Sequence, residues 1–352
     1  MKILLVLSLI LVHVVILPSC RIIPEQERKP NIILDVDMSV DDMMSILYFL
    51  SCPDIVIKAI TVENGVSTVD SGAEIVLRLL NLTGHPEIRV AKGTGQPLAG
   101  GNAFPAQWRP SVSRPFGLEL PPHELKLSEP DAATTITQLI NAHKNDITIM
   151  ALGPMTNIAQ VLLNDPGLAK NINQIYISDG AVDVEGGIYQ EWPQINNCVS
   201  GWNLWVDARA AGIVFSCGAP VVLVPLDLTA LHGKDPLVLT ENFVQKYKRQ
   251  ATGTIGQNMA VLMENWLRYY VYNQQTEITI KGVPIWDVVA CMIFHHPEIG
   301  TRWEDRHVRI EEGAPETAGQ IVTVEKGTPN VRICFKGDQT LMDSLLLMTT
   351  GK

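Results

Sequence analysis

The fold is decided by the stretch Asn31-Ile-Ile-Leu-Asp35-Val-Asp37-Met-Ser-Val-Asp41-Asp42-Met-Met-Ser-Ile-Leu-Tyr-Phe-Leu50. An apolar run of strand type, Ile32 to Leu34, leads into four carboxylates within eight positions, and an apolar run of helical length follows at once. In a strand–loop–helix unit the loop lies at the carboxyl end of the strand, where open α/β sheets bind ligands. The stretch therefore predicts a ligand-binding loop.

The four carboxylates of this loop repel one another, so the arrangement needs something to offset their charge. A hard cation with oxygen ligands would do so, and Ca²⁺ or Mg²⁺ suits carboxylates better than zinc does. Asp41 and Asp42 could instead cap a helix and complement its dipole, and Asp35 could accept hydrogen bonds from loop amides. The additional Asp37, on a loop leaving an apolar strand, favours a metal site.

Composition and patterning indicate a large α/β domain. The chain has 352 residues, of which 46% are hydrophobic and 18% charged, enough for one large core or two small ones. Strands and helices alternate, for example at 55–62, 69–80 and 88–91, which predicts a mostly parallel open sheet with helices on both faces. The formal charge of −10 disfavours a nucleic-acid partner and is compatible with a small neutral or cationic substrate.

Residues 1–19 predict an export signal. One lysine precedes an apolar run that ends in small residues, which is typical of a secretory signal peptide. Leu17-Pro18-Ser19-Cys20 resembles a bacterial lipoprotein cleavage box with Cys20 as the lipidated residue, although Pro18 is unusual there and plain secretion stays open. Residues 20–30 are then a tether and 31–352 the folded domain. The expected location is periplasmic or membrane-anchored through Cys20, with secretion as the alternative.

Three segments carry a resemblance to the inosine-uridine-preferring nucleoside hydrolase family. The four acids match its Asp-x-Asp-x-Gly-x-Asp-Asp signature, except that Ser39 replaces the glycine of that signature. We expect the backbone at this position to have a positive φ angle, which serine tolerates less well than glycine. Ala151-Leu-Gly-Pro-Met-Thr-Asn-Ile-Ala159 is similar to its Gly-Pro-Leu-Thr-Asn-Ile-Ala, and Trp286-Asp287 stands where many members have His-Asp. The resemblance covers residues 31 to about 350 and implies a single α/β domain with a Rossmann-like core.

The resemblance also implies a calcium site. By position in the motifs, Ca²⁺ would be held by Asp37, Asp42, Asp287 and the backbone carbonyl of Leu152, and carbonyl and carboxylate oxygens are ligands that Ca²⁺ accepts. Asp37 would also take the proton of the attacking water. Asp35 would orient the loop from behind the ligands.

Further positions are implied to bind the substrate. Asp41 and Asn203 match residues that fix the sugar diol, and Trp202 and Trp286 are aromatic residues beside the substrate. At the end of the second strand the family has Gly-Asn, whereas this chain has Asn64-Gly65. Asn64 is therefore either a site residue in a shifted position or part of a turn.

Two departures from the family pattern concern the chemistry. The family's glutamate, a ligand for the 5′-hydroxyl, falls on Gly201. The histidine that protonates the leaving purine in many members is Trp286, whose indole cannot act as a general acid at neutral pH, and none of the eight histidines is a clear replacement.

The predicted function is calcium-dependent hydrolysis of the N-glycosidic bond of ribonucleosides, releasing base and ribose. Two alternatives remain: a calcium-dependent binder of ribose or nucleosides with lost catalysis, and a hydrolase of a different riboside. The expected partners are a small nucleoside or riboside and further copies of the chain, as a dimer or tetramer.

Four other segments give expectations about the fold. The proline-rich residues 98–130 form a long loop, either a lid or a surface excursion. Residues 183–199 form another loop, and residues 308–322 and 330–335 a closing β-hairpin. The stretch Glu241 to Gln275 reads as amphipathic helix, whose aromatic residues either contact a base or pack the core; these are Trp266, Tyr269, Tyr270 and Tyr272.

Overall fold

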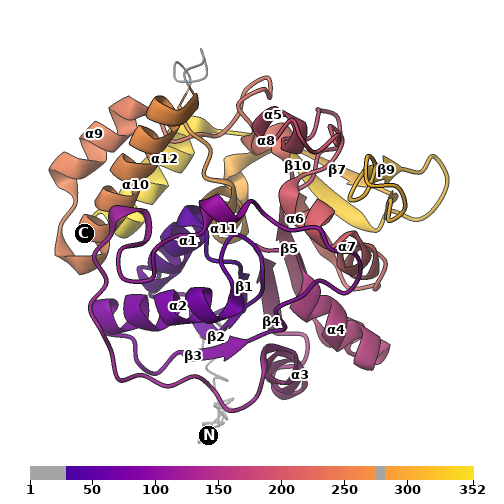
Figure 1. Cartoon of the computed structure of the whole chain (residues 1–352), viewed down its shortest axis with the longest axis horizontal. Coiled ribbons are helices and arrows are strands. Elements are labelled where there is room, and N and C mark those ends of the chain that lie inside the picture. The colour runs from indigo at the N-terminus through magenta and orange to yellow at the C-terminus, as the bar shows by residue number, and fades with distance from the viewer. Residues whose placement is uncertain (1–28, 275–281) are drawn as a thin grey trace, which may run out of the picture.

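An eight-stranded sheet runs through the middle of the protein. The computed structural model describes residues 29–274 and 282–352, so the predicted signal peptide and Cys20 lie outside the described residues. The strand order is β3-β2-β1-β4-β5-β6-β10-β7, and a separate two-stranded sheet pairs β8 with β9 (Figure 1). The strands are β1 (Asn31–Val36), β2 (Val56–Val62), β3 (Arg89–Lys92), β4 (Ile147–Ala151), β5 (Gln174–Ser178), β6 (Val221–Val224), β7 (Gly300–Arg306), β8 (Val308–Ile310), β9 (Ile321–Thr323) and β10 (Val331–Gly337).

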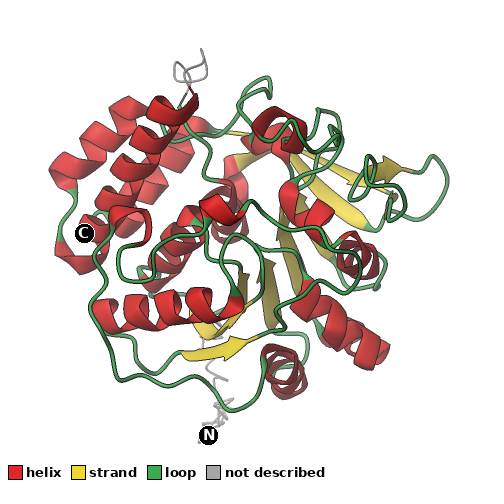
Figure 2. Cartoon of the chain, viewed as in Figure 1, coloured by secondary structure: helices red, strands yellow, loops and turns green. Residues whose placement is uncertain are grey.

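Helices cover both faces of this sheet, as predicted (Figure 2). Alternate residues of β1 show why, because Ile32 and Leu34 join the hydrophobic core on one face and Ile33 joins the core on the other. The helices of the first face are α1 (Val40–Leu50), α2 (Val69–Thr83), α9 (Glu241–Gln250), α10 (Gly253–Gln274), α11 (Trp286–His295) and α12 (Gln339–Thr350). Those of the second face are α3 (Ala132–Ala142), α4 (Thr156–Asn164) and α7 (Ala208–Phe215).

The strand order places a ligand crevice at the end of β1. Strands β3-β2-β1-β4-β5-β6 are all parallel to their neighbours, in the order of a Rossmann-like core; β10 is parallel to β6, and the edge strand β7 is antiparallel to β10. The order reverses between β1 and β4, and ligands bind beyond the carboxyl ends of the strands at such a switch point. The loop that follows β1 is therefore at the position that the sequence predicted.

The backbone of this loop differs from the prediction at one residue. Ser39 has φ of −75° and extended backbone, whereas the residue in the left-handed region is Met38, with φ of 60°. Ser39 is the N-cap of α1, and its backbone N–H donates to Asp42 Oδ2 at 2.7 Å. A serine is well suited to this position, because N-cap residues favour extended backbone and short polar side chains.

Three secondary-structure predictions were wrong in detail. Residues 308–322 and 330–335 do not form one hairpin: β8 pairs with β9, while β10 enters the main sheet between β6 and β7. The predicted helix 241–275 breaks into α9 and α10 near Gly253, whose φ is 64°. The predicted loop 183–199 contains a short helix, α5 (Ile188–Glu191).

Short helices follow the last parallel strands of the sheet. They are α6 (Trp202–Val206), after β5, and α8 (Leu226–Thr229), after β6. Within the described ranges, no helix is both long and apolar enough to cross a membrane.

Adjacent leucines on α4 test the core of the second face. Leu162 is 3% exposed and Leu163 is 51% exposed. We expect Leu162→Ala to lower the free energy of unfolding by about 2–5 kcal/mol, because it removes buried methyl groups and leaves a cavity. Leu163→Ala should change it by less than about 0.5 kcal/mol. Urea denaturation followed by circular dichroism measures both, and equal losses would contradict this packing of α4.

Candidate active site

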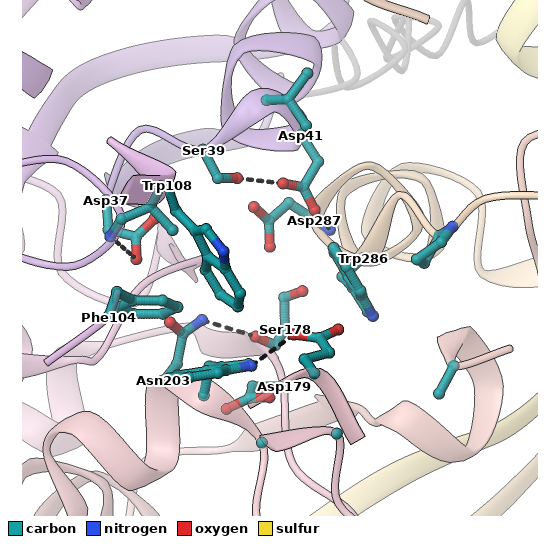
Figure 3. Close-up of a pocket in the computed structure, with 18 of the residues that line it drawn as sticks. Asp37, Ser39, Asp41, Phe104, Trp108, Ser178, Asp179, Asn203, Trp286 and Asp287 are labelled. Atoms are coloured by element: carbon teal, nitrogen blue, oxygen red, sulfur yellow. Dashed lines mark hydrogen bonds between the residues drawn. The ribbon is translucent and has the colours of Figure 1, made fainter. Parts of the chain in front are cut away.

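A pocket of about 370 Å³ opens at the carboxyl ends of β1, β4 and β5. Its wall also includes residues from the loop 98–130, from α6 and from the helices α10 and α11. Figure 3 shows Asp37, Asp41 and Asp287 on one side of the pocket and Asn203 and other polar residues on the opposite side. A pocket of this size is in the range of small-molecule binding sites.

Four buried carboxylates form a cluster at one end of the pocket: Asp37, Asp41 and Asp287 line it, and Asp42 lies beside them without lining it. The backbone N–H of Asp287 donates to Asp41 Oδ2 at 3.2 Å, which joins the start of α11 to the start of α1. Asp42 is fully buried, and its Oδ1 atom has no hydrogen-bond partner. The structure thus brings together the carboxylates that the sequence predicted from opposite ends of the domain.

The acids of this cluster hold their protons more tightly than usual. Burial, with the charge of Asp41, raises the pKa of Asp37 to about 7. Burial raises the pKa of Asp42 well above its ordinary value, and the charges of Asp287 and Asp37 add to it. Burial and then the charge of Asp41 do the same for Asp287. Within the part of the chain that the structure describes, no lysine or arginine acts on these four buried acids, and a divalent cation would stabilise such a site.

The donor set fits a hard cation. Apart from the unpartnered Oδ1 of Asp42, the cluster offers oxygen atoms from Asp37, Asp41 and Asp287, which suit Ca²⁺. The described residues contain one group of three acidic, His or Cys side chains with ligand atoms within 4.8 Å, and it lies elsewhere. The oxygen atoms of the aspartate cluster therefore do not all lie within 4.8 Å of one another. Such spacing is compatible with Ca²⁺, because two ligand atoms on opposite sides of a calcium ion are about 5 Å apart.

That other group consists of Cys52, Asp54 and His295. Hydrogen bonds account for it, since His295 Nδ1 lies 2.8 Å from the Tyr48 hydroxyl and Nε2 lies 3.0 Å from Asp54 Oδ2. Burial raises the pKa of the Cys52 thiol to about 12, which opposes the thiolate that a soft metal ion needs. The group therefore has the chemistry of a hydrogen-bonded link between α1 and α11.

Asp35, which the sequence predicts to orient the loop from behind the ligands, does not line the pocket. Its Oδ1 accepts hydrogen bonds from Thr61 Oγ1 at 2.6 Å and from Asn157 Nδ2 at 2.8 Å. Glu63, which the sequence analysis did not assign, accepts from the backbone N–H of Met155 at 2.8 Å and is fully buried. These bonds tie the ends of β1 and β2 to the start of α4.

The predicted sugar-side residues Asn203 and Trp202 both line the pocket. Asn203 Nδ2 donates to the backbone carbonyl of Leu152 at 3.0 Å, so the carbonyl predicted as a metal ligand faces the same region. Asn64 lies elsewhere: it lines a second, separate pocket with Thr68 and its neighbours. Asn64 is therefore not a residue of the main pocket, and the alternative in which Asn64-Gly65 forms part of a turn remains.

Asp179, directly after β5, is a pocket residue that sequence analysis did not assign. It is buried, and it accepts a hydrogen bond from the backbone N–H of Leu204 at 2.8 Å. A Cβ atom added to Gly201 would lie 1.7 Å from Asp179 Oδ1. The Asp179 carboxylate therefore fills the space that a side chain at position 201 would need, which explains the glycine where the family pattern has glutamate.

Aromatic side chains form two further parts of the wall. Trp202 stacks on Phe104 with ring centroids 5.3 Å apart, and Trp108 packs edge-on against Trp202 at 4.8 Å. Phe104 and Trp108 come from the proline-rich loop 98–130, which thereby borders the pocket instead of extending into solvent. The second part comes from α10 and α11, where Trp266 stacks on Tyr269 at 5.4 Å and contacts Tyr270 and Trp286.

A family model for inosine-uridine preferring nucleoside hydrolases matches residues 32–343, nearly the whole described domain. The chain belongs to this family. Its Rossmann-like domain and the acids at the end of β1 are thus explained by common descent, and each of the three motifs that suggested the family contributes residues to one pocket.

Curated nucleoside hydrolases from plants and bacteria are similar to this chain in sequence. Pyrimidine-specific ribonucleoside hydrolase RihA of Citrobacter koseri is 30% identical over 83% of this chain and 87% of the relative. Uridine nucleosidase 1 of Arabidopsis thaliana is 32% identical over 57% of this chain. The match spans 58% of the Arabidopsis protein and 61% of a probable uridine nucleosidase 1 of Oryza sativa.

Solved structures share the fold. A plant nucleoside hydrolase, the PpNRh1 enzyme, superposes with a TM-score of 0.78 at 23% identity, covering 92% of this chain and 99% of the other. A purine-preferring ribonucleoside hydrolase of Gardnerella vaginalis gives a TM-score of 0.77 at 22% identity, covering 91% and 98%.

The acid cluster predicts an inverse dependence of stability on pH in calcium-free buffer. The pKa of Asp37 is raised from 3.8 to about 7, so between these values the folded state holds a proton that the unfolded state has released. Stability is then lost as pH rises through this window. We expect the Tm in chelator to rise by about 2–5 °C from about pH 8 to about pH 5.5, and calcium to remove most of this change.

Two variants check the origin of that pH dependence. Asp42→Asn should raise the Tm in chelator at about pH 8, because it removes one of the repelling charges. Glu316→Gln, at an exposed acid away from the cluster, should behave as the unmodified protein does. Differential scanning fluorimetry measures the series, and an identical pH response of the two variants would contradict the role of the cluster.

Proposed function

We propose that the protein hydrolyses the N-glycosidic bond of ribonucleosides and releases the base and ribose. The observation that supports this most directly is the placement of the family's acidic motifs from both ends of the chain at one end of an aromatic-lined pocket. The match to RihA extends over most of both chains, and the names of the listed plant and bacterial relatives point to pyrimidine nucleosides as the first substrates to test.

Cleavage of this bond passes through a sugar with oxocarbenium character, with water as the incoming group. Asp37 is the proposed base that takes the proton from this water, and the Val66 N–H, 3.0 Å from Oδ2, orients its carboxylate. Asp41 and Asn203 are proposed to hold the sugar diol, since both line the pocket beside the cluster.

Calcium is part of the proposal. Asp37, Asp42, Asp287 and the Leu152 carbonyl are the proposed ligands, supported by the buried and partly unpartnered carboxylates. When bound, Ca²⁺ would supply activation of the attacking water and charge to hold the sugar hydroxyls. Ionisation of all the buried acids becomes favourable only with such a charge among them.

Asp37→Asn tests the assignment of the base. With calcium present, we expect kcat for ribose release from uridine, cytidine or inosine to fall by about 10²- to 10⁴-fold, because the attacking water loses its proton acceptor. A reducing-sugar assay measures the release, and Glu316→Gln serves as the matched surface control. Undiminished turnover by Asp37→Asn would exclude this residue as the base.

We also propose that Asp179 binds the sugar hydroxyl that the family's glutamate would bind. Its carboxylate occupies the space next to Gly201 and accepts hydrogen bonds from the backbone N–H groups of Asn203 and Leu204, so it lies beside the proposed sugar-binding Asn203. A carboxylate and a hydroxyl form a charge-assisted hydrogen bond. The acceptor has on this view moved from position 201 to position 179.

A charge swap tests this relocation. For the preferred nucleoside, we expect unmodified protein to favour the substrate over its 5′-deoxy analogue by about 10- to 100-fold in kcat/KM, the value of one hydrogen bond to a charged group. Asp179→Gly should lose this preference, and Gly201→Glu alone should be impaired by the close approach of its Cβ to Asp179.

The double variant Asp179→Gly/Gly201→Glu should regain much of the preference, because it frees the space and returns a carboxylate to it. If Asp179→Gly discriminates between the two substrates as well as the unmodified protein does, Asp179 is not the acceptor.

A further inference from the structure

Hydrolysis of a nucleoside leaves one proton to be accounted for at the departing base. The base leaves with the electron pair of the broken bond, and protonation of a base nitrogen makes this departure easier. Trp286 lines the pocket but its indole cannot supply that proton. The inference below rests on the proposed hydrolase function and concerns which side chain acts as the acid.

Most of the titratable groups of the pocket are committed or unsuited to this role. Three aspartates belong to the acid cluster, and Asp179 accepts backbone hydrogen bonds on the sugar side. Burial raises the pKa of the Tyr269 and Tyr270 hydroxyls, which makes them weaker acids. His232 is exposed at the pocket, and its Nε2 lies 2.8 Å from the backbone carbonyl of Glu185.

Glu191 is the remaining acid in the pocket wall. It is the last residue of α5, and its Oε2 accepts a hydrogen bond from Trp202 Nε1 at 2.7 Å. Among the described residues, its side chain has no other hydrogen bond and no cationic partner. Trp202 therefore fixes one carboxyl oxygen and leaves Oε1 for a proton and for the substrate.

The surroundings of Glu191 place it between the two aromatic parts of the wall. Its partner Trp202 stacks on Phe104, and its charge also acts on Tyr269 and Tyr270 of α10. A planar base fits between such aromatic faces. Burial raises the pKa of Glu191 to about 7, and the negative charge of Asp179 adds to the effect, so much of this carboxyl is protonated at neutral pH.

We propose that Glu191 is the general acid that protonates the leaving base. As the bond from the anomeric carbon to the base nitrogen breaks, the base takes the electron pair of that bond and the proton on Glu191 Oε1. Water adds to the anomeric carbon and gives a proton to Asp37. Transfer of this proton to solvent, and uptake of another by Glu191, restores the site.

Two substrates separate this role from a structural one. A nucleoside needs protonation of its leaving group, whereas 4-nitrophenyl riboside releases a phenolate that is stable near neutral pH. With calcium present, we expect Glu191→Gln to lower kcat for the nucleoside by about 10²- to 10⁴-fold and that for the nitrophenyl riboside by less than about tenfold. Glutamine keeps the acceptor for Trp202 Nε1, so the wall stays in place.

The pH profile provides a second measurement. Because Glu191 must be protonated, kcat of the unmodified protein for the nucleoside should decline as pH rises above about 7, and this decline should be absent in Glu191→Gln. His232→Gln is the matched control at a second titratable pocket residue, and it should affect the two substrates equally.

The outcomes distinguish the two proposals. If Glu191→Gln lowers kcat equally for both substrates, Glu191 only positions Trp202, and its assignment as the acid is overturned. A selective loss on the nucleoside in His232→Gln would move the assignment to the histidine. If the unmodified protein with calcium cleaves neither riboside, the hydrolase function fails, and the role of Glu191 fails with it.

Discussion

The burial of like charges is the constraint on which the rest of the structure depends. Four aspartates lie out of water at the switch point of the sheet, and no lysine or arginine of the described residues offsets their charge. Such a group is costly unless its members are protonated or share a cation, and one member even has an oxygen without a partner. The fold maintains this arrangement because β1 is packed by apolar cores on both faces of the sheet, and α1 and α11 belong to the core on one of these faces.

A network of hydrogen bonds supports this cluster from behind. Glu63 binds the backbone at the start of α4, Asn157 of the same helix binds Asp35, and Asp35 also binds Thr61. The ends of β1 and β2 and the start of α4 are thereby held together behind the acid cluster. The placement of the acids at the end of β1 depends on this support, since precise placement of reactive groups requires neighbours that fix them.

The opposite parts of the pocket differ in character from the acidic end. They are built from stacked aromatic side chains, some from a proline-rich loop and some from α10 and α11. Within them, the two departures from the family pattern each have a counterpart nearby. Asp179 occupies the space beside Gly201, and Glu191 lies in the pocket wall that also includes Trp286. The loss of a residue at a motif position is thus accompanied by a carboxylate from a different element.

The sequence by itself determined the parallel α/β class, the four acids between the end of β1 and the start of α1, and the set of acids that gathers at the pocket. These follow from local patterns, an apolar strand followed by acids and then a helix, together with motifs in family order. Glu63 and Asp179 also follow buried strands, so the same pattern could have identified them.

Only the tertiary structure decided the rest, because it depends on contacts between distant segments. The closeness of Asp179 to position 201, the hydrogen bond of Glu191 to Trp202, and the exclusion of Asn64 from the main pocket have no local signature. The same holds for β10, which enters the sheet beside β6 instead of closing a hairpin. Which distant segments come into contact is decided by how well their side chains fill space and by whether their buried backbone groups find hydrogen-bond partners. Both conditions are met only when the whole chain is packed.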